Sequence, residues 1–193
     1  MEIIVVDIET GVIEPTLNNY DIDNCLICEI GIVNLDLETG ESKVIFDRTC
    51  QEKPGAHPSS WVFKHTSLTL EEVTDSQHFH DLKPPIQELL DDSKPVTSWN
   101  HDFDLAILES RGLKIPSTFW DPKTTLKHFL EIPHPSGQGH KWPSVQEAYK
   151  YFYPDRIFVQ THRAIQDAII EADIIHQAVL KWPILKNQWK DYT

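Results

Sequence analysis

The beginning of the chain constrains its fold most, because a run of β-branched apolar residues leads directly into two carboxylates. Residues 3–6 (IIVV) are typical of a strand that is buried on both faces of a sheet. Asp7 and Glu9 follow at positions i and i+2, which places both side chains on one face of a strand. Two acids on a buried face repel each other and lose hydration unless a cation or a shared proton compensates. The pattern predicts a metal-binding pair at the strand end, with two solvated acids beyond the strand as the alternative.

The length and the apolar pattern predict one folded unit. A chain of 193 residues can form one full hydrophobic core but is too short for two ordinary domains. We expect a single domain over residues 1–193, in which 182–193 form a C-terminal tail. No apolar run approaches the roughly 20 residues of a bilayer span, and the N-terminus lacks the basic region of a secretory signal. We therefore expect a cytoplasmic protein that does not contact membranes.

The charge limits the kind of partner. The chain carries 17 basic and 30 acidic residues and a net charge of −13, which argues against a broad surface that follows phosphates. If the partner is a nucleic acid, contact should be confined to a short terminus, with metal ions supplying positive charge.

The cysteines favour a structural role. Cys25, Cys28 and Cys50 are too few for a disulfide framework. Cys25 and Cys28 form a C-x-x-C pair that could be half of a zinc site or a redox pair. However, no second pair follows, and residues i and i+3 of a strand point to opposite faces. We expect core cysteines.

The remaining pattern indicates an α/β domain with a mixed sheet, because the strands cluster early and the helices are interleaved late. Segments 26–36 and 42–49 are joined by hairpin turn residues, so we expect antiparallel neighbours. Short strands are expected at 96–99 and 118–120. Helices are expected at 68–73, 84–91, 104–111, 123–130, 144–153 and 164–182.

Two further acidic motifs stand where the chain enters a helix. Residues 100–108 fit N-x-x-F-D-x-x-x-L, and residues 162–167 fit H-x-A-x-x-D. Each motif alone has an ordinary explanation: Asp104 as a favourable first-turn acid, Asp167 as a surface acid and His162 as a polar residue at a helix entrance.

Together with residues 7–10, these motifs resemble the DnaQ-like family of 3′-to-5′ exonucleases, in its DEDDh branch. Residues 27–31 also resemble the family's second strand, and 64–66 resemble its histidine-bearing substrate loop. Gly11, Trp99 and Ile165 depart from the commoner residues of the motifs. These departures leave the four acids and the histidine unchanged.

The resemblance implies an α/β RNase H-like fold, in which helices flank a mixed central sheet, and hydrolysis of the 3′-terminal phosphodiester of single-stranded DNA or RNA, releasing nucleoside monophosphates. Asp7, Glu9, Asp104 and Asp167 form a hard-oxygen set suited to two Mg²⁺ or Mn²⁺ ions. His162 is the expected general base, because histidine is the side chain that ordinarily exchanges a proton near neutral pH. Expected substrate-binding residues are Ile8, Thr10, His65, Asn100 and Phe103.

Several alternatives remain open at this point. An enzyme of the same fold could prefer dinucleotides, RNA tails or mismatched DNA ends, and a non-catalytic nucleic-acid or protein interaction module could retain the fold. A structural domain with coincidental acids would bind no divalent cation. Trp61 and Phe63 are expected in the core, with a substrate-facing role as the alternative. The oligomeric state is open, and a homodimer is one option.

Overall fold

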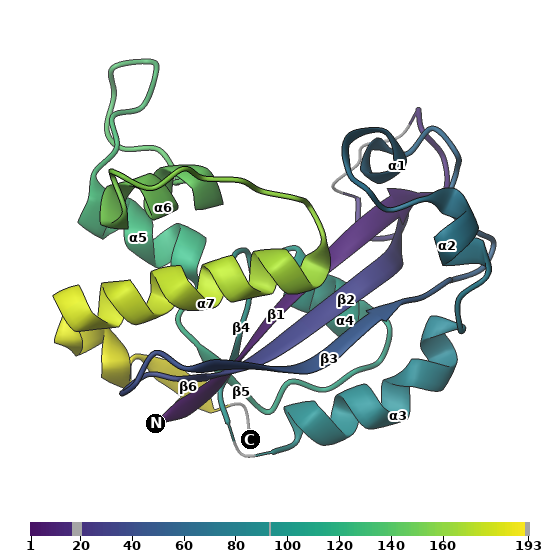
Figure 1. The fold of residues 1–193 in the computed structure, drawn as a ribbon, viewed down its shortest axis with the longest axis horizontal. Helices are drawn as coiled ribbons and strands as arrows, with labels where there is room; N and C mark the ends of the chain where they lie inside the picture. The colour runs from purple at the N-terminus through teal and green to yellow at the C-terminus, as the bar shows by residue number, and fades with distance from the viewer. Residues whose placement is uncertain (17–20, 93, 192–193) are drawn as a thin grey trace.

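A six-stranded mixed sheet forms the centre of the molecule, with strand order β3-β2-β1-β4-β5-β6 (Figure 1). The computed structural model describes residues 1–16, 21–92 and 94–191. The strands are β1 (Glu2–Val12), β2 (Cys25–Asp36), β3 (Ser42–Thr49), β4 (Val96–Thr97), β5 (Ser117–Phe119) and β6 (Trp189–Asp191). The helices are α1 (Trp61–His65), α2 (Leu70–Thr74), α3 (Phe79–Leu90), α4 (Asp104–Ser110), α5 (Pro122–Leu130), α6 (Val145–Phe152), α7 (Ala164–Lys181) and the 3₁₀ helix η1 (Pro183–Asn187). The predicted α/β architecture is confirmed.

The strand pairing places the N-terminal strand in the middle of the sheet. β1 pairs antiparallel with β2, and β2 pairs antiparallel with β3, as the hairpin residues predicted. On its other side β1 pairs parallel with β4, which pairs parallel with β5. β1 is therefore covered on both edges and both faces, as its continuous apolar run requires.

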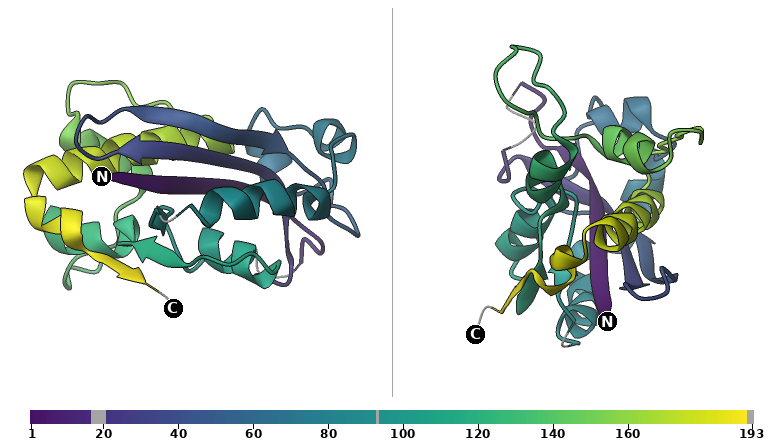
Figure 2. Two further views of the ribbon diagram at one scale, coloured as in Figure 1. Left: turned by 90° about the horizontal axis from the view of Figure 1, so that it is seen from below. Right: turned by 90° about the vertical axis from the view of Figure 1, so that its left-hand side faces the viewer.

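Alternate residues of β1 belong to two separate cores. Ile3 and Val5 pack with buried residues of α5, α6 and α7. Ile4, Val6 and Ile8 pack with buried residues of α3 and α4. The left view of Figure 2 shows α7 and α3 on opposite sides of β1. The face that carries α7 is the one that Asp7 and Glu9 share with Ile3 and Val5.

Helix α3 differs from the prediction at its start. It begins at Phe79 rather than Pro84, so Pro84 and Pro85 lie inside the helix instead of in its first turn. Both prolines lie on the exposed face, where water can solvate the carbonyls of the preceding turn that they cannot bond. The opposite face buries a regular apolar stripe, formed by Phe79, Leu82, Ile86 and Leu90.

Two other segments carry structure that was not expected. The aromatic segment 61–65 forms the short helix α1. Within the stretch expected as a tail, η1 is followed by β6, which pairs antiparallel with β5. The last two residues, 192 and 193, lie outside the described part of the chain.

The cysteine prediction is confirmed. Cys25, Cys28 and Cys50 are buried and form no disulfide within the described residues. Cys25 and Cys28 contribute to different apolar clusters, because they point to opposite faces of β2. Within residues 1–16, 21–92 and 94–191, none of the helices has the length and hydrophobicity to cross a membrane.

Candidate active site

The first two carboxylates lie at the end of the apolar run of β1. Asp7 and Glu9 are partly buried and alternate with Ile8, whose side chain packs in the opposite core. The pairing with β2 shifts register between Glu9 and Thr10, which marks a β-bulge. Bulges redirect side chains and are common beside active sites. The local strand geometry thus holds both acids on the side of the sheet that faces α7.

The third carboxylate lies on the helix that follows β4. Asp104 is the first residue of α4 and is buried. Its Oδ1 accepts the backbone N–H of Ile8 at 3.4 Å, while its own N–H donates to the carbonyl of Asn100 at 3.1 Å. These two bonds hold Asp104 beside Ile8, the residue between Asp7 and Glu9.

The fourth carboxylate lies in the first turn of α7. Asp167 is buried, and Nε2 of Gln160 donates to its Oδ2 at 2.9 Å. His162 lies nearby, with Nδ1 3.7 Å from the same Oδ2. Glu9, His162 and Asp167 offer one ligand atom each, and these atoms all lie within 4.8 Å of one another. The third motif is therefore brought against the first, although residues 9 and 162 are far apart in sequence.

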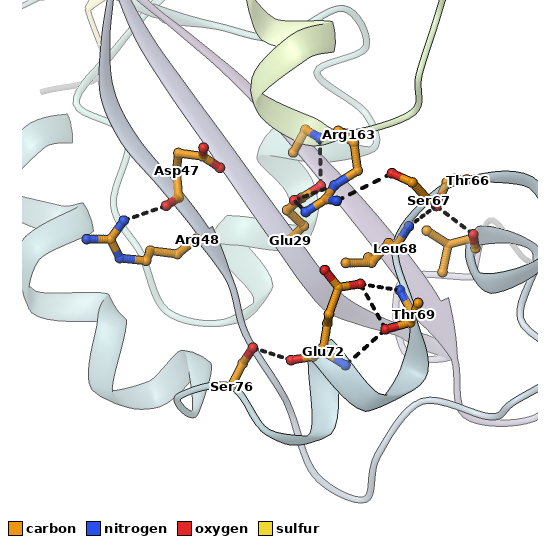
Figure 3. A network of polar contacts seen from close by, with 12 residues as sticks. Glu29, Asp47, Arg48, Thr66, Ser67, Leu68, Thr69, Glu72, Ser76 and Arg163 are labelled. Atoms are coloured by element: carbon orange, nitrogen blue, oxygen red, sulfur yellow. Dashed lines mark hydrogen bonds and ion pairs between the residues drawn. The ribbon is translucent and has the colours of Figure 1, made fainter.

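A buried glutamate of β2 fixes the entrance of α7. Oε2 of Glu29 accepts the backbone N–H of Ala164 at 2.9 Å, and Oε1 lies 2.6 Å from Nη2 of Arg163. Figure 3 shows Arg163 between Glu29 and Ser67, to which its guanidinium also donates at 3.4 Å. Sequence reasoning did not assign this role to Glu29. The sequence feature that could have indicated this role is a single acid within an otherwise apolar strand.

Small residues let α7 approach the sheet closely. A Cβ atom on Gly31 of β2 would lie 2.4 Å from the backbone nitrogen of Ile165, so only glycine fits there. Ala164, Ala168 and Ala172 are fully buried on the facing side of the helix. This close packing brings Asp167 within reach of the acids on β1.

The crowding of carboxylates shifts their protonation. Burial raises the pKa of Asp7 well above its usual value, and the surrounding acids raise it further. Burial, followed by the charge of Asp167, raises the pKa of Glu9 to about 8. Burial raises the pKa of Asp104 to about 7. Burial also raises the pKa of Asp167, although the hydrogen bond from Gln160 opposes this rise.

A fifth carboxylate joins the group, and sequence reasoning missed it. Glu171 lies one turn after Asp167 on the same face of α7 and is 1% exposed. Its Oε2 accepts the backbone N–H of Trp99 at 3.2 Å. Burial, together with the charges of Asp104 and Asp167, raises the pKa of Glu171 well above its usual value. The sequence feature that could have identified Glu171 is its position, which the apolar stripe of α7 predicts to be buried.

The ring of Trp61 lies beside the histidine at the site. Trp61 is 46% exposed, contrary to the expected core position, whereas Phe63 packs partly buried in a small core. The ring of Trp61 stacks on His65 at a centroid distance of 4.7 Å. It also meets His162 edge-on at 5.0 Å. His65 is thus linked to the acid cluster through Trp61.

The other expected substrate residues lie at different depths. Asn100 is half-buried, and its carbonyl caps the entrance of α4. Phe103 is partly buried against the core that includes α3 and α4. Thr10 follows the bulge, and its side chain is hydrogen-bonded to Cys25. Ile8 is buried, and its backbone N–H is engaged by Asp104.

The donor set fits hard divalent cations. Oδ2 of Asp7 and Oδ1 of Asp167 are buried without a hydrogen-bond partner in the part of the chain that the structure describes. Buried oxygens of this kind cost free energy unless a cation or proton binds them. Carboxylate oxygens suit Mg²⁺ or Mn²⁺ better than zinc, which favours nitrogen and sulfur ligands.

A comparison with protein families decides the assignment. The model of a family described as exonuclease (RNase T) matches residues 4–175. The chain belongs to the exonuclease family. All three acidic motifs lie inside the matched range. The elements η1 and β6 of this chain follow it. A search of curated proteins found no match.

Solved exonuclease structures share the fold. One is a 3′-exonuclease whose structure is described as showing 3′-end-specific recognition of a histone mRNA stem-loop. It is 14% identical in sequence, with a TM-score of 0.71, and the match covers 94% of this chain and 82% of that chain. The nuclease domain of 3′hExo, a DEDDh family member bound to rAMP, has 12% identity and a TM-score of 0.70 over 94% and 92%. E. coli Exonuclease I in complex with an oligonucleotide has 13% identity and a TM-score of 0.67 over 95% of this chain but 42% of its own. The expected RNase H-like fold and the resemblance to DEDDh exonucleases are confirmed.

Proposed function

We propose that this exonuclease-family protein hydrolyses the 3′-terminal phosphodiester of single-stranded DNA or RNA in the presence of Mg²⁺ or Mn²⁺ and releases nucleoside monophosphates. The observation that carries the proposal is the convergence of Asp7, Glu9, Asp104 and Asp167 from β1, α4 and α7. Their mutual repulsion is relieved if cations bind, and such cations attract a phosphodiester. The 3′ direction is supported by the similarity to 3′-exonucleases of the same fold.

The four carboxylates would hold the metal ions. Bound divalent ions would stabilise negative charge on the attacking and leaving oxygens of the phosphodiester and favour ionisation of water. The protein contributes a rigid set of oxygens, because Asp104 is fixed by Ile8 and Asp167 by Gln160. Three buried cysteines that form no disulfide within the described residues support a reducing compartment such as the cytoplasm.

His162 is the proposed general base. It is partly exposed, adjoins Glu9 and Asp167, and lies just before α7. From this place it can accept the proton of the attacking water, and a general base of this type contributes about 10²- to 10⁴-fold to the rate. The edge contact with Trp61 restricts the histidine ring to the side of the acids.

Exposed groups beside His162 are proposed to hold the terminal nucleotide. Trp61 and His65 present a stacked pair of rings next to the site, and aromatic faces stack on any base. Asn100 and Thr10 offer polar groups to the sugar, and Phe103 an apolar wall. Little in this arrangement distinguishes DNA from RNA, so the proposal includes both.

Digestion of end-labelled oligonucleotides tests the proposal. Single-stranded DNA and RNA carrying a label at either end would be incubated with Mg²⁺, Mn²⁺ or EDTA. We expect a 5′-labelled strand to shorten stepwise and a 3′-labelled strand to release its label at once, only with metal. The Asp104→Asn variant is the control for contaminating nucleases. Binding without any metal-dependent hydrolysis would instead indicate an interaction module that retains the fold.

A further inference from the structure

An exposed tryptophan with two lysines lies outside the proposed active site. Trp142 is 56% exposed. Nζ of Lys127 lies 4.8 Å from its ring centroid, and Nζ of Lys123 lies 5.7 Å from it. Both lysines are on α5, four residues apart and therefore on one face. We call Trp142, Lys123 and Lys127 the α5 platform.

No ion pair within the described residues neutralises the positive charge of the α5 platform. Neither Lys123 nor Lys127 has a carboxylate within ion-pair distance in residues 1–16, 21–92 and 94–191. The neighbouring Lys141, by contrast, is paired with Glu147 at 2.8 Å. In a chain of net charge −13, unpaired lysines around an exposed aromatic ring form a local site for an anion with a flat apolar part.

Hydrogen bonds fix the α5 platform to the second acidic motif. The backbone N–H of Lys123 donates to the carbonyl of Trp99 at 3.1 Å. Asp121, which caps α5, accepts the backbone N–H of His101 at 3.0 Å. Asn100 lies between these two anchored residues, so the start of α5 adjoins the loop that leads to Asp104.

The loop between α5 and α6 holds Trp142 in place. Pro133 and His140 form an isolated antiparallel bridge, and the N–H of Lys141 donates to the carbonyl of Ile132 at 2.9 Å. These contacts close the base of the loop, which extends away from the body in Figure 1. Trp142 therefore emerges beside α5 rather than at the tip of the loop.

We propose that the α5 platform binds the single-stranded substrate upstream of its 3′-terminal nucleotide, by stacking one base on Trp142 and pairing phosphates with Lys123 and Lys127. The inference rests on the proposed exonuclease function and extends it to a second contact. Base stacking on an aromatic side chain requires no particular sequence, which suits an enzyme that shortens a strand step by step. Because the platform is small, the gain should reach a plateau once a strand is long enough to reach it.

The chain contains a matched control for this chemistry. Nζ of Lys181 lies 4.3 Å from the ring centroid of the partly exposed Tyr151 and 5.4 Å from that of Trp182. Lys181 is fourteen residues after Asp167 on α7, about 21 Å along the helix from the acids at 1.5 Å per residue. A general loss of positive or aromatic surface would affect both clusters, whereas a substrate contact requires the α5 platform alone.

The experiment compares kcat/KM for a dinucleotide with that for a single strand of about ten nucleotides, with Mg²⁺. We expect Trp142→Ala to lower the ratio of kcat/KM for the decamer to kcat/KM for the dinucleotide about tenfold. The double variant Lys123→Ala/Lys127→Ala should lower this ratio by a similar factor. Trp142→Phe should retain most of the ratio, and Lys181→Ala should leave it unchanged. For the double variant, the slope of log affinity against log salt, measured by anisotropy with a labelled decamer in the Asp104→Asn background, should become shallower by about 1.4.

The outcomes separate the two proposals. If the unmodified protein hydrolyses neither substrate with metal, the proposed function fails. If it hydrolyses both but the platform variants change the ratio no more than Lys181→Ala does, the inference is overturned while the function stands. Circular dichroism verifies that each variant is folded, and Lys127→Glu on the helix surface provides a charge reversal that leaves the loop intact.

Discussion

The buried carboxylate of Glu171 accepts the backbone N–H of Trp99 at 3.2 Å. This bond joins the second turn of α7, just after Asp167, to the residue that precedes Asn100. Two of the three acidic motifs are thereby held in a fixed relation through a residue that belongs to neither. The charge of Glu171 also raises the pKa of Asp7, so Glu171 acts on the first motif as well.

We expect Glu171→Gln to retain most activity and stability, because the amide oxygen can still accept the N–H of Trp99. Glu171→Ala should lower the free energy of unfolding by about 1–3 kcal/mol through the unpaired N–H alone. It should also lower kcat about ten- to hundredfold, because the motifs lose their alignment. Thermal denaturation and steady-state kinetics measure both effects. A Gln variant as inactive as Asp104→Asn would indicate that Glu171 is itself a metal ligand.

Asp104→Asn should lower metal-dependent hydrolysis at least about a hundredfold, because the variant loses a charged ligand and the preorganised charge it provides. In EDTA the same variant should be at least as thermostable as the unmodified protein, because one member of a repelling group has been removed. Near-normal hydrolysis by the purified variant would show that the site has been assigned wrongly.

His162→Ala should reduce kcat by about 10²- to 10⁴-fold, because a general base is lost while all four carboxylates remain. Calorimetric titration with Mn²⁺ should give an affinity close to that of the unmodified protein. A ring nitrogen of His162 lies within 4.8 Å of carboxylate oxygens of Glu9 and Asp167. The titration therefore decides whether His162 is a general base or a metal ligand. A loss of metal binding equal to that of Asp104→Asn would make His162 a ligand.

Without metal, stability should fall as pH rises. The folded protein holds the pKa of Glu9 at about 8 and that of Asp104 at about 7, far above their values in an unfolded chain. Between the unfolded and folded pKa values these two groups bind more protons in the folded state. Their contribution to stability is therefore fully present below about pH 4 and is lost as the pH rises through about 8. In EDTA, Tm should be lower at about pH 8.5 than at about pH 5.5. Millimolar Mg²⁺ should remove most of this difference, because it binds the ionised carboxylates.

The main features of the site were predictable because each motif stands at a local structural transition. The end of a buried strand places Asp7 and Glu9, and a helix entrance places Asp104. Sequence spacing could not predict Gln160, which bonds Asp167 from a segment without regular structure. Nor could it reveal that Trp61 is exposed, because only the tertiary fold places its ring beside His162.

The fold showed the same division between local and long-range information. β3 was predicted at its observed bounds because both its pattern and its turn are local. The start of α3 was missed because proline usually marks a helix start, whereas burial of Phe79 and Leu82 extends the helix toward the N-terminus. β6 depends on pairing with β5, a contact that residues 189–191 alone do not encode.

The backbone of His162 has a positive φ of 50°. Non-glycine residues in this left-handed region are less stable by about 1–2 kcal/mol than in the right-handed one. Glycine would relieve that cost, yet it would remove the imidazole. The proposed general base is therefore held in place at the expense of thermostability, so a search for stabilising substitutions would select against the residue on which catalysis depends.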